Sequence, residues 1–228
     1  VELANYLPPQ YEHGVLGGTF DHLHSGHKLL LTMATLYCTT SLSIGLSSDD
    51  LLVNKQYPQF LQSYTLRYTL LMQFFTLITP HLHIEITPLI DVYGCSLKPH
   101  LNVLIVSQEP KVKENGLLVN KKRQQLNIPI LDIIYINLTG GHNSDKTSST
   151  TIRHQLDQQV KQAKEYINLH HHDIAIKDVN EEEYIFLYHV ITQLIPSVCH
   201  TPQLQQQTAK NFLLHYNPLL HSTGENDL

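Results

Sequence analysis

Residues 14–28 read GVLGGTFDHLHSGHK. The apolar start of this stretch predicts the end of a buried strand, and the apolar run that follows it predicts a helix. Between them, Gly17 and Gly18 let backbone amides approach an anion without a Cβ in the way, while the helix N-terminus adds unpaired N–H groups and a positive partial charge. His24 and His27 stand three residues apart, so we expect them to project from the same side of the first helical turn. The stretch therefore predicts a phosphate site.

Short apolar runs alternate with segments of helical periodicity as far as residue 138. We expect strands ending at residue 16 and at residues 41–46, 82–88, 101–107 and 130–138, with helices at residues 25–36, 64–78 and 116–125. This alternation predicts an α/β fold with a Rossmann-like parallel sheet of five strands, in which ligands bind at the carboxyl ends of the strands. The polar residues that follow the expected strands are then gathered at one edge: residues 17–27, Lys55, Asp91, Ser107 and residues 148–153.

A second motif, KTSSTTIR at residues 146–153, precedes an amphipathic helical pattern. Hydroxyl residues in this position are also common as simple helix N-caps, so by themselves they leave two interpretations open. The roles of Lys55 and Arg67 also stay open between binding and simple solvation, because a loop lysine or a helix arginine is often a solvated surface residue. Asp91 and Tyr93, in the turn PLIDVYG at residues 88–94, could equally close that turn through the aspartate side chain.

The run Thr19-Phe20-Asp21 followed by His24-Ser25-Gly26-His27 resembles the signature of the HxGH nucleotidyltransferase superfamily, whose members join nucleotides to phosphorylated acceptors and release pyrophosphate. Residues 17–28 are most similar to the eukaryotic and archaeal phosphopantetheine adenylyltransferases of coenzyme A synthesis. The KTSSTTIR motif resembles the ISSTxxR element of that family, with Thr147 in place of the usual isoleucine. The resemblance implies a Rossmann-like fold of the nucleotidyltransferase type, with Mg²⁺ arriving with ATP and no dedicated metal site.

The resemblance also assigns residues to roles. It implies His24, His27, Lys55 and Arg153 as the catalytic residues. The implied nucleotide-binding residues are Gly17, Gly18, Thr19, Phe20, His24, His27, Ser107, Asn120, Arg123, Ser148, Ser149, Thr150 and Arg153. The implied acceptor-binding residues are Thr19, Lys55, Arg67, Asp91 and Tyr93. Around Ser107 the match is to a Ser-x-Glu-Thr run that precedes Gly, Asn and Arg on a helix; here Pro110 replaces the threonine, and residues 121–123 could instead be a solvated helix face.

Composition bounds the remaining possibilities. A net charge of −5 argues against a general nucleic-acid binder, since affinity for a phosphate backbone comes mainly from lysine and arginine. We expect no membrane span, because no run of about 18 apolar residues occurs, and no signal peptide in residues 1–13. Three cysteines, odd in number and far apart, are typical of reduced thiols, so we expect a cytoplasmic protein.

We expect an N-terminal extension at residues 1–13, a nucleotidyltransferase domain at residues 14–168, and a helical appendage at residues 169–228 packed on it, with helices at residues 181–195 and 203–216. Bifunctional relatives carry a dephospho-coenzyme A kinase domain after this point. No Gly-x-x-x-x-Gly-Lys-Ser/Thr loop occurs in the sequence, so we do not expect the kinase activity from it.

The leading hypothesis is therefore transfer of AMP from ATP to 4′-phosphopantetheine, giving dephospho-coenzyme A and pyrophosphate. Coenzyme A is an expected inhibitor, because it differs from that product by one phosphate, and the other coenzyme A pathway enzymes are expected partners. Two alternatives stay open: a transferase of the same superfamily that uses CTP or nicotinamide mononucleotide, and a catalytically silent paralogue that serves as a nucleotide-binding or scaffold subunit.

Overall fold

The computed structural model describes residues 10–138, 148–171, 179–199 and 201–215 of the 228-residue chain. The chain divides into two compact units, Val1–Ile152 and Arg153–Leu228. Residues 1–9 of the expected N-terminal extension lie outside the described residues, as do Lys146 and Thr147 of the second motif. The first unit carries the sheet, and the described part of the second unit is helical.

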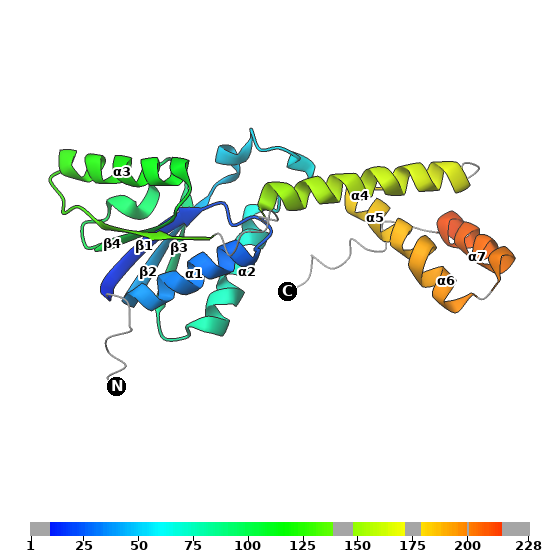
Figure 1. Cartoon of the computed structure of the whole chain (residues 1–228), viewed down its shortest axis with the longest axis horizontal. Coiled ribbons are helices and arrows are strands. Elements are labelled where there is room, and N and C mark those ends of the chain that lie inside the picture. Colours follow the sequence, from blue (N-terminus) through cyan, green and yellow to red (C-terminus); the bar gives the residue numbers. More distant parts are fainter. Residues whose placement is uncertain (1–9, 139–147, 172–178, 200, 216–228) are drawn as a thin grey trace. The chain divides into compact units, whose positions relative to one another are not determined.

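The predicted five-stranded parallel sheet is confirmed (Figure 1). Its strand order is β3-β2-β1-β4-β5, so β1 lies in the middle and is paired on both sides. The strands are β1 (Tyr11–Gly18), β2 (Cys38–Ser47), β3 (His83–Leu89), β4 (Val103–Ser107) and β5 (Asp132–Ile136). All pairs are parallel, which places every strand's carboxyl end at one edge of the sheet.

Helices cover both faces of this sheet, as a parallel sheet requires (Figure 1). On one face, α1 (Ser25–Tyr37) and α2 (Tyr64–Ile78) pack their apolar residues against alternate strand residues such as Leu16 and Ile44. On the other face, α3 (Pro110–Gln125) packs through Val119 against Val15 and Leu104. Short 3-10 turns, η2 (Asp49–Leu52), η3 (Pro58–Phe60) and η4 (Gly94–Leu97), lie in the connections.

Several elements of the first unit differ in their bounds from the expectation. Strand β1 begins at Tyr11, three residues before Gly14, and continues through Gly17 and Gly18, which pair with residues of β2. Helix α3 begins at Pro110 rather than at residue 116. A proline at the first helical position loses no hydrogen bond, because the N–H it lacks would have no partner inside the helix.

The second unit has a hydrophobic cluster of its own. Its helical elements are α4 (Ser149–His170, which starts in the first unit), α5 (Glu181–His189), a π-helical turn η5 (Val190–Leu194), α6 (Ile195–Val198) and α7 (Pro202–His215). Ile167 of α4 is buried in this cluster with Leu187 and Ala209. The division therefore falls inside α4, before the expected boundary at residue 168, because the later turns of α4 build this second core.

Within the part of the chain that the structure describes, no helix combines the length and the apolar character needed to cross a membrane. The three cysteines all lie among the described residues, and all three are free thiols.

Candidate active site

The connection from β1 to α1 turns through residues that are not glycine. Phe20 and His22 adopt positive φ angles of 50° and 46°, in the left-handed region that side chains other than glycine rarely occupy. Phe20 is nevertheless buried in the core. Strain of this kind costs roughly 1–3 kcal/mol per residue and is kept only where surrounding contacts enforce it. Hydrogen bonds made by Asp21, His22 and Arg67 hold this turn in place.

His24 and His27 lie against each other at the start of α1. His24 is the N-cap residue, and its ring stacks on that of His27 with 3.8 Å between centroids and 26° between planes. Gly26 makes room for the pair, because a Cβ at this position would lie 3.2 Å from Nδ1 and Cε1 of His24. The edge of the Phe20 ring supports His27 from the other direction, with centroids 5.3 Å apart. The predicted placement of both histidines on one side of the first turn agrees with this geometry.

The Nδ1 atoms of His24 and His27 are buried, and neither has a hydrogen-bond partner among the described residues. A buried polar atom without a partner costs about 1–3 kcal/mol, which a ligand oxygen can recover. Burial, with a smaller contribution from the adjacent His24, lowers the pKa of His27 to about 3. Burial also lowers the pKa of His24, although the charges of Asp21 and Glu109 oppose that shift. His27 is therefore neutral at pH 7, and as a neutral imidazole it can still donate one N–H.

The second motif reaches the same loop. The Oγ of Ser149, in the first turn of α4, donates a 2.7 Å hydrogen bond to the backbone oxygen of Asp21. Ser148 caps the helix, since its Oγ accepts a hydrogen bond from the backbone N–H of Thr151. The N-cap interpretation thus holds for Ser148, while Ser149 joins the α4 N-terminus to the loop that carries the histidines. Thr150 is exposed, and Arg153 is buried at the start of the second unit.

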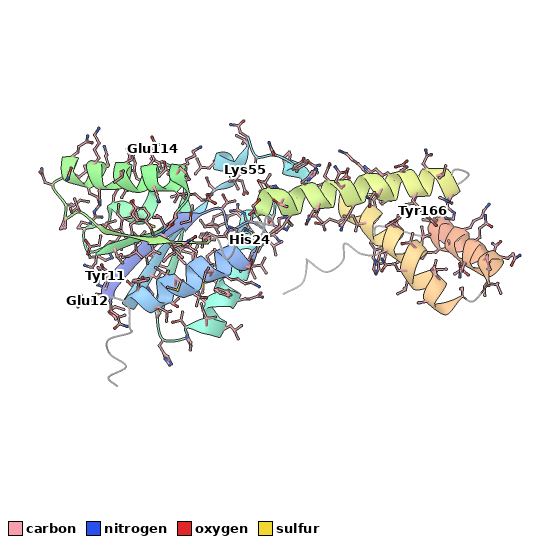
Figure 2. The ribbon with its side chains drawn as sticks, in the orientation of Figure 1. Tyr11, Glu12, His24, Lys55, Glu114 and Tyr166 are labelled. Carbon is pink, nitrogen blue, oxygen red and sulfur yellow. The ribbon has the colours of Figure 1, made fainter. Side chains whose placement is uncertain are left out.

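Lys55 and Ser107 follow two other strands at this edge. Lys55 is exposed on the connection after β2, and Figure 2 shows it on a different loop from His24, at the same end of the sheet. Ser107 is the last residue of β4 and is buried. Glu109 follows it, and its charge acts on His24. Glu109 is the acidic residue of the run that resembles Ser-x-Glu-Thr, and that resemblance implied no role for it.

Asn120 and Arg123 lie elsewhere. The side-chain amide of Asn120 exchanges two 2.8 Å hydrogen bonds with the backbone of Leu131, immediately before β5. Arg123 is fully buried and donates to backbone oxygens of Lys98 and Pro129, in the segments that lead into β4 and β5. These contacts belong to the amino ends of the strands, opposite the histidines. We do not include either residue in the proposed site.

The turn after β3 is closed by its own aspartate. Oδ1 of Asp91 accepts hydrogen bonds from the backbone N–H groups of Tyr93 (2.8 Å) and Gly94 (2.7 Å). Gly94 has a φ of 47°, and a Cβ there would lie 2.2 Å from the Leu89 side chain, so the turn requires glycine. Asp91 therefore has a structural role, and contact of Asp91 or Tyr93 with an acceptor stays a prediction.

Arg67 is fully buried, and each nitrogen of its guanidinium group donates within the protein. Nε donates to the backbone oxygen of Gln62, Nη1 to those of Thr19 and Ser47, and Nη2 to the carboxylate of Asp49. The expected acceptor contact of Arg67 stays a prediction. The helical pattern around Arg67 did not reveal these partners, because Thr19 and Ser47 belong to distant segments and are contacted through their backbone oxygens.

Residues 15–155 match the family described as Cytidylyltransferase-like. The chain belongs to the Cytidylyltransferase-like family. A phosphopantetheine adenylyltransferase of Saccharomyces cerevisiae is 39% identical over 146 residues, covering 62% of this chain and 47% of that protein. The phosphopantetheine adenylyltransferase of Thermococcus gammatolerans is 36% identical over 144 residues, covering 63% of this chain and 88% of that protein. The expected resemblance is thereby confirmed.

Two further comparisons extend this Cytidylyltransferase-like assignment. An uncharacterized protein of Schizosaccharomyces pombe is 32% identical over 149 residues, covering 62% of this chain and 47% of that protein. The match thus spans about half the length of the two yeast relatives. A crystal structure of a protein of unknown function from Archaeoglobus fulgidus aligns with a TM-score of 0.50 and 25% identity, over 59% of this chain and 96% of that one. The family match at residues 15–155 covers the described sheet of the first unit and the first residues of α4.

Proposed function

We propose that this nucleotidyltransferase moves the AMP moiety of ATP to 4′-phosphopantetheine, forming dephospho-coenzyme A and pyrophosphate. The observation that carries the proposal is the stacked pair of His24 and His27 at a helix N-terminus, whose Nδ1 atoms have no hydrogen-bond partner in the described part of the chain. A pair of neutral donors beside unpaired backbone N–H groups suits phosphoryl oxygens. The names of the S. cerevisiae and T. gammatolerans relatives support adenylyl transfer to phosphopantetheine in particular.

The reaction needs no covalent intermediate and no general base. The phosphate of the acceptor is ionised at neutral pH, so one of its oxygens attacks the α-phosphorus of ATP directly. A new P–O bond forms as the bond to the β-phosphate oxygen breaks, and pyrophosphate leaves with the electron pair. The protein has to hold two anions together and to stabilise the charge that develops on the α-phosphoryl and leaving oxygens.

His27 and His24 are the proposed donors to the α-phosphoryl oxygens. Because His27 is neutral, its N–H is present throughout the physiological pH range, and the site carries no repulsion between two imidazolium groups. Removing one donor of this kind costs roughly 3 kcal/mol, or about a hundredfold in rate. Thr19 and Lys55 are proposed to position the acceptor phosphate.

The nucleotide phosphates are proposed to lie against residues at the ends of β1 and β4 and at the start of α4. The proposed set is Gly17, Gly18, Thr19, Phe20, Ser107, Ser148, Ser149 and Thr150, and the nucleotide contact expected of Arg153 stays a prediction. Gly17 is exposed at the end of β1, and the start of α4 offers the N–H groups that have no partner inside a helix. Among the described residues, no group of three or more His, Cys, Asp or Glu side chains could hold a metal ion. Mg²⁺ is therefore proposed to enter with ATP, as part of the substrate.

The test measures pyrophosphate release with ATP, Mg²⁺ and 4′-phosphopantetheine, and each of the three is omitted in turn. In further reactions CTP replaces ATP, or nicotinamide mononucleotide replaces 4′-phosphopantetheine. Release that needs ATP and phosphopantetheine together, and that falls at least a hundredfold in His27→Ala, is the expected result. Release with a different pair of substrates would assign another transfer reaction, and ATP binding without turnover would assign a scaffold. Adding coenzyme A tests product-like inhibition in the same assay.

A further inference from the structure

Two loops of the first unit carry the groups proposed to hold the two anions. The histidine loop, residues 19–24, connects β1 to α1 and ends at His24. The lysine loop, residues 48–63, connects β2 to α2 and carries the exposed Lys55. Both loops contact Arg67, the buried arginine of α2.

Arg67 contacts both ends of the lysine loop with one planar group. At the start of the loop, Nη1 donates to the oxygen of Ser47 (2.9 Å) and Nη2 to the carboxylate of Asp49 (2.7 Å). At its end, Nε donates to the oxygen of Gln62 (2.9 Å). The guanidinium group therefore closes the base of the loop in which Lys55 lies.

The same group is bonded to the histidine loop, because Nη1 also donates to the oxygen of Thr19 (3.0 Å). Gln62 adds a second connection. Its backbone N–H donates to the buried carboxylate of Asp21 (3.0 Å), and its side-chain oxygen accepts from the backbone N–H of His22 (2.7 Å). These bonds hold His22, and with it the left-handed turn that leads to His24.

We propose that Arg67 is a positioning residue that fixes the histidine loop and the lysine loop relative to each other, so that the donors for the two anions keep one separation. This inference rests on the proposed function, because it assigns each loop to one of two reacting anions. A guanidinium group is suited to the task, since it presents five donors in a rigid plane. A lysine keeps the charge but has a single nitrogen, which cannot reach four oxygens on separate segments at once.

The first test compares Arg67→Lys with Leu71→Ala. Leu71 lies one helical turn later on α2 and is wholly buried, so its truncation destabilises the same helix while leaving the guanidinium contacts intact. We expect Arg67→Lys to lower kcat about a hundredfold with less than a fivefold change in either KM, because misplaced ligands slow a reaction more than they weaken binding. Leu71→Ala should keep the kcat of the parent. Equal losses of kcat in both variants would reduce Arg67 to a stability role and overturn the proposal.

A double-mutant cycle tests whether Arg67 acts through the lysine loop. If it does, Lys55→Ala lowers kcat/KM strongly in the parent but much less in the Arg67→Lys background, because Lys55 has already lost its position there. If the factors by which the two substitutions lower kcat/KM simply multiply in the double variant, the proposal is contradicted. Asp49→Ala serves where Arg67→Lys does not fold, since Asp49 is largely exposed and its truncation removes only one of the four contacts. It should lower kcat severalfold, and an unchanged kcat would count against the proposal.

Amide hydrogen exchange separates this proposal from the proposed function. In Arg67→Lys, peptides from residues 17–23 and 47–52 should exchange at least tenfold faster than in the parent, while peptides from β4 keep their rate. This readout needs no substrate. If the parent transfers no AMP, the proposed function fails and the exchange result still decides whether Arg67 joins the loops. If the parent is active and neither exchange nor kcat responds to Arg67→Lys, the positioning role is wrong.

Discussion

Replacing His27 should remove much of the protein's loss of stability in mild acid. Burial lowers the pKa of His27 to about 3 in the folded protein, whereas the unfolded chain has the ordinary value of about 6.5. Below pH 6.5 the unfolded chain therefore binds a proton that the folded protein does not. Stability from this residue is fully present above pH 6.5 and falls by about 1.4 kcal/mol per pH unit down to about pH 3.

Between pH 7 and pH 5 this linkage amounts to about 2 kcal/mol of unfolding free energy. His27→Asn has no titrating group at the position, so its unfolding free energy should fall by about 2 kcal/mol less than that of the parent over the same range. Urea unfolding at pH 7.0, 6.0 and 5.0 measures the difference. The comparison is between slopes against pH, so any change in stability common to all three pH values cancels.

His81→Asn is the matched control, because it makes the same substitution at an exposed histidine just beyond α2. If the parent and His27→Asn lose equal stability between pH 7 and pH 5, the ring is not held neutral by burial. In that case the interpretation of His27 as a neutral donor to the phosphoryl group is wrong.

Three other substitutions test separate parts of the site. Gly26→Ala should stabilise α1 by up to about 1 kcal/mol, because alanine has a higher helix propensity than glycine. It should also lower kcat about tenfold, because the added Cβ displaces the His24 ring. Thermal melts should therefore show a higher melting temperature while turnover assays show a lower kcat. Arg123→Lys should lower the unfolding free energy by about 2 kcal/mol, because buried backbone carbonyls lose their hydrogen-bond donor. The affinity for ATP, measured by calorimetry, should stay within twofold of the parent's. A tenfold loss of affinity would instead support the nucleotide-binding role that the resemblance implies for Arg123. Asp91→Asn keeps an oxygen for the turn but removes the charge, so the KM for phosphopantetheine should stay within twofold, and a large increase would indicate direct contact with the acceptor.

The number of strands and their parallel direction could be predicted from the sequence because they follow from periodicity, whereas the strand order came from the structure. Continuous apolar runs such as residues 101–107 are characteristic of parallel strands covered on both faces, and their carboxyl ends must meet at one edge. That argument placed His24, Lys55 and Ser107 at the same edge of the sheet. It also placed Asp91 after β3, where the structure shows it closing the turn.

Other features depend on contacts between segments far apart in the chain, which no local pattern records. The left-handed turn uses Phe20 and His22, although the neighbouring glycines were the obvious candidates for unusual backbone angles. Arg67 and Arg123 resemble surface cations in a helical repeat, yet both are buried because backbone oxygens from distant segments converge on them. The positions of such oxygens are set by tertiary structure alone.

The closed base of the lysine loop has a consequence for how this fold can diversify. With Ser47, Asp49 and Gln62 held by one side chain, the exposed residues 53–56 can change in number or identity without disturbing the strand and helix on either side. Doubling the length of such a loop costs only about 0.6 kcal/mol in closure entropy. If the proposed function holds, selection, or a library built at Val53, Asn54 and Gln56 with Lys55 kept, could therefore alter which phosphorylated acceptor is accepted while the histidine pair and the sheet stay unchanged.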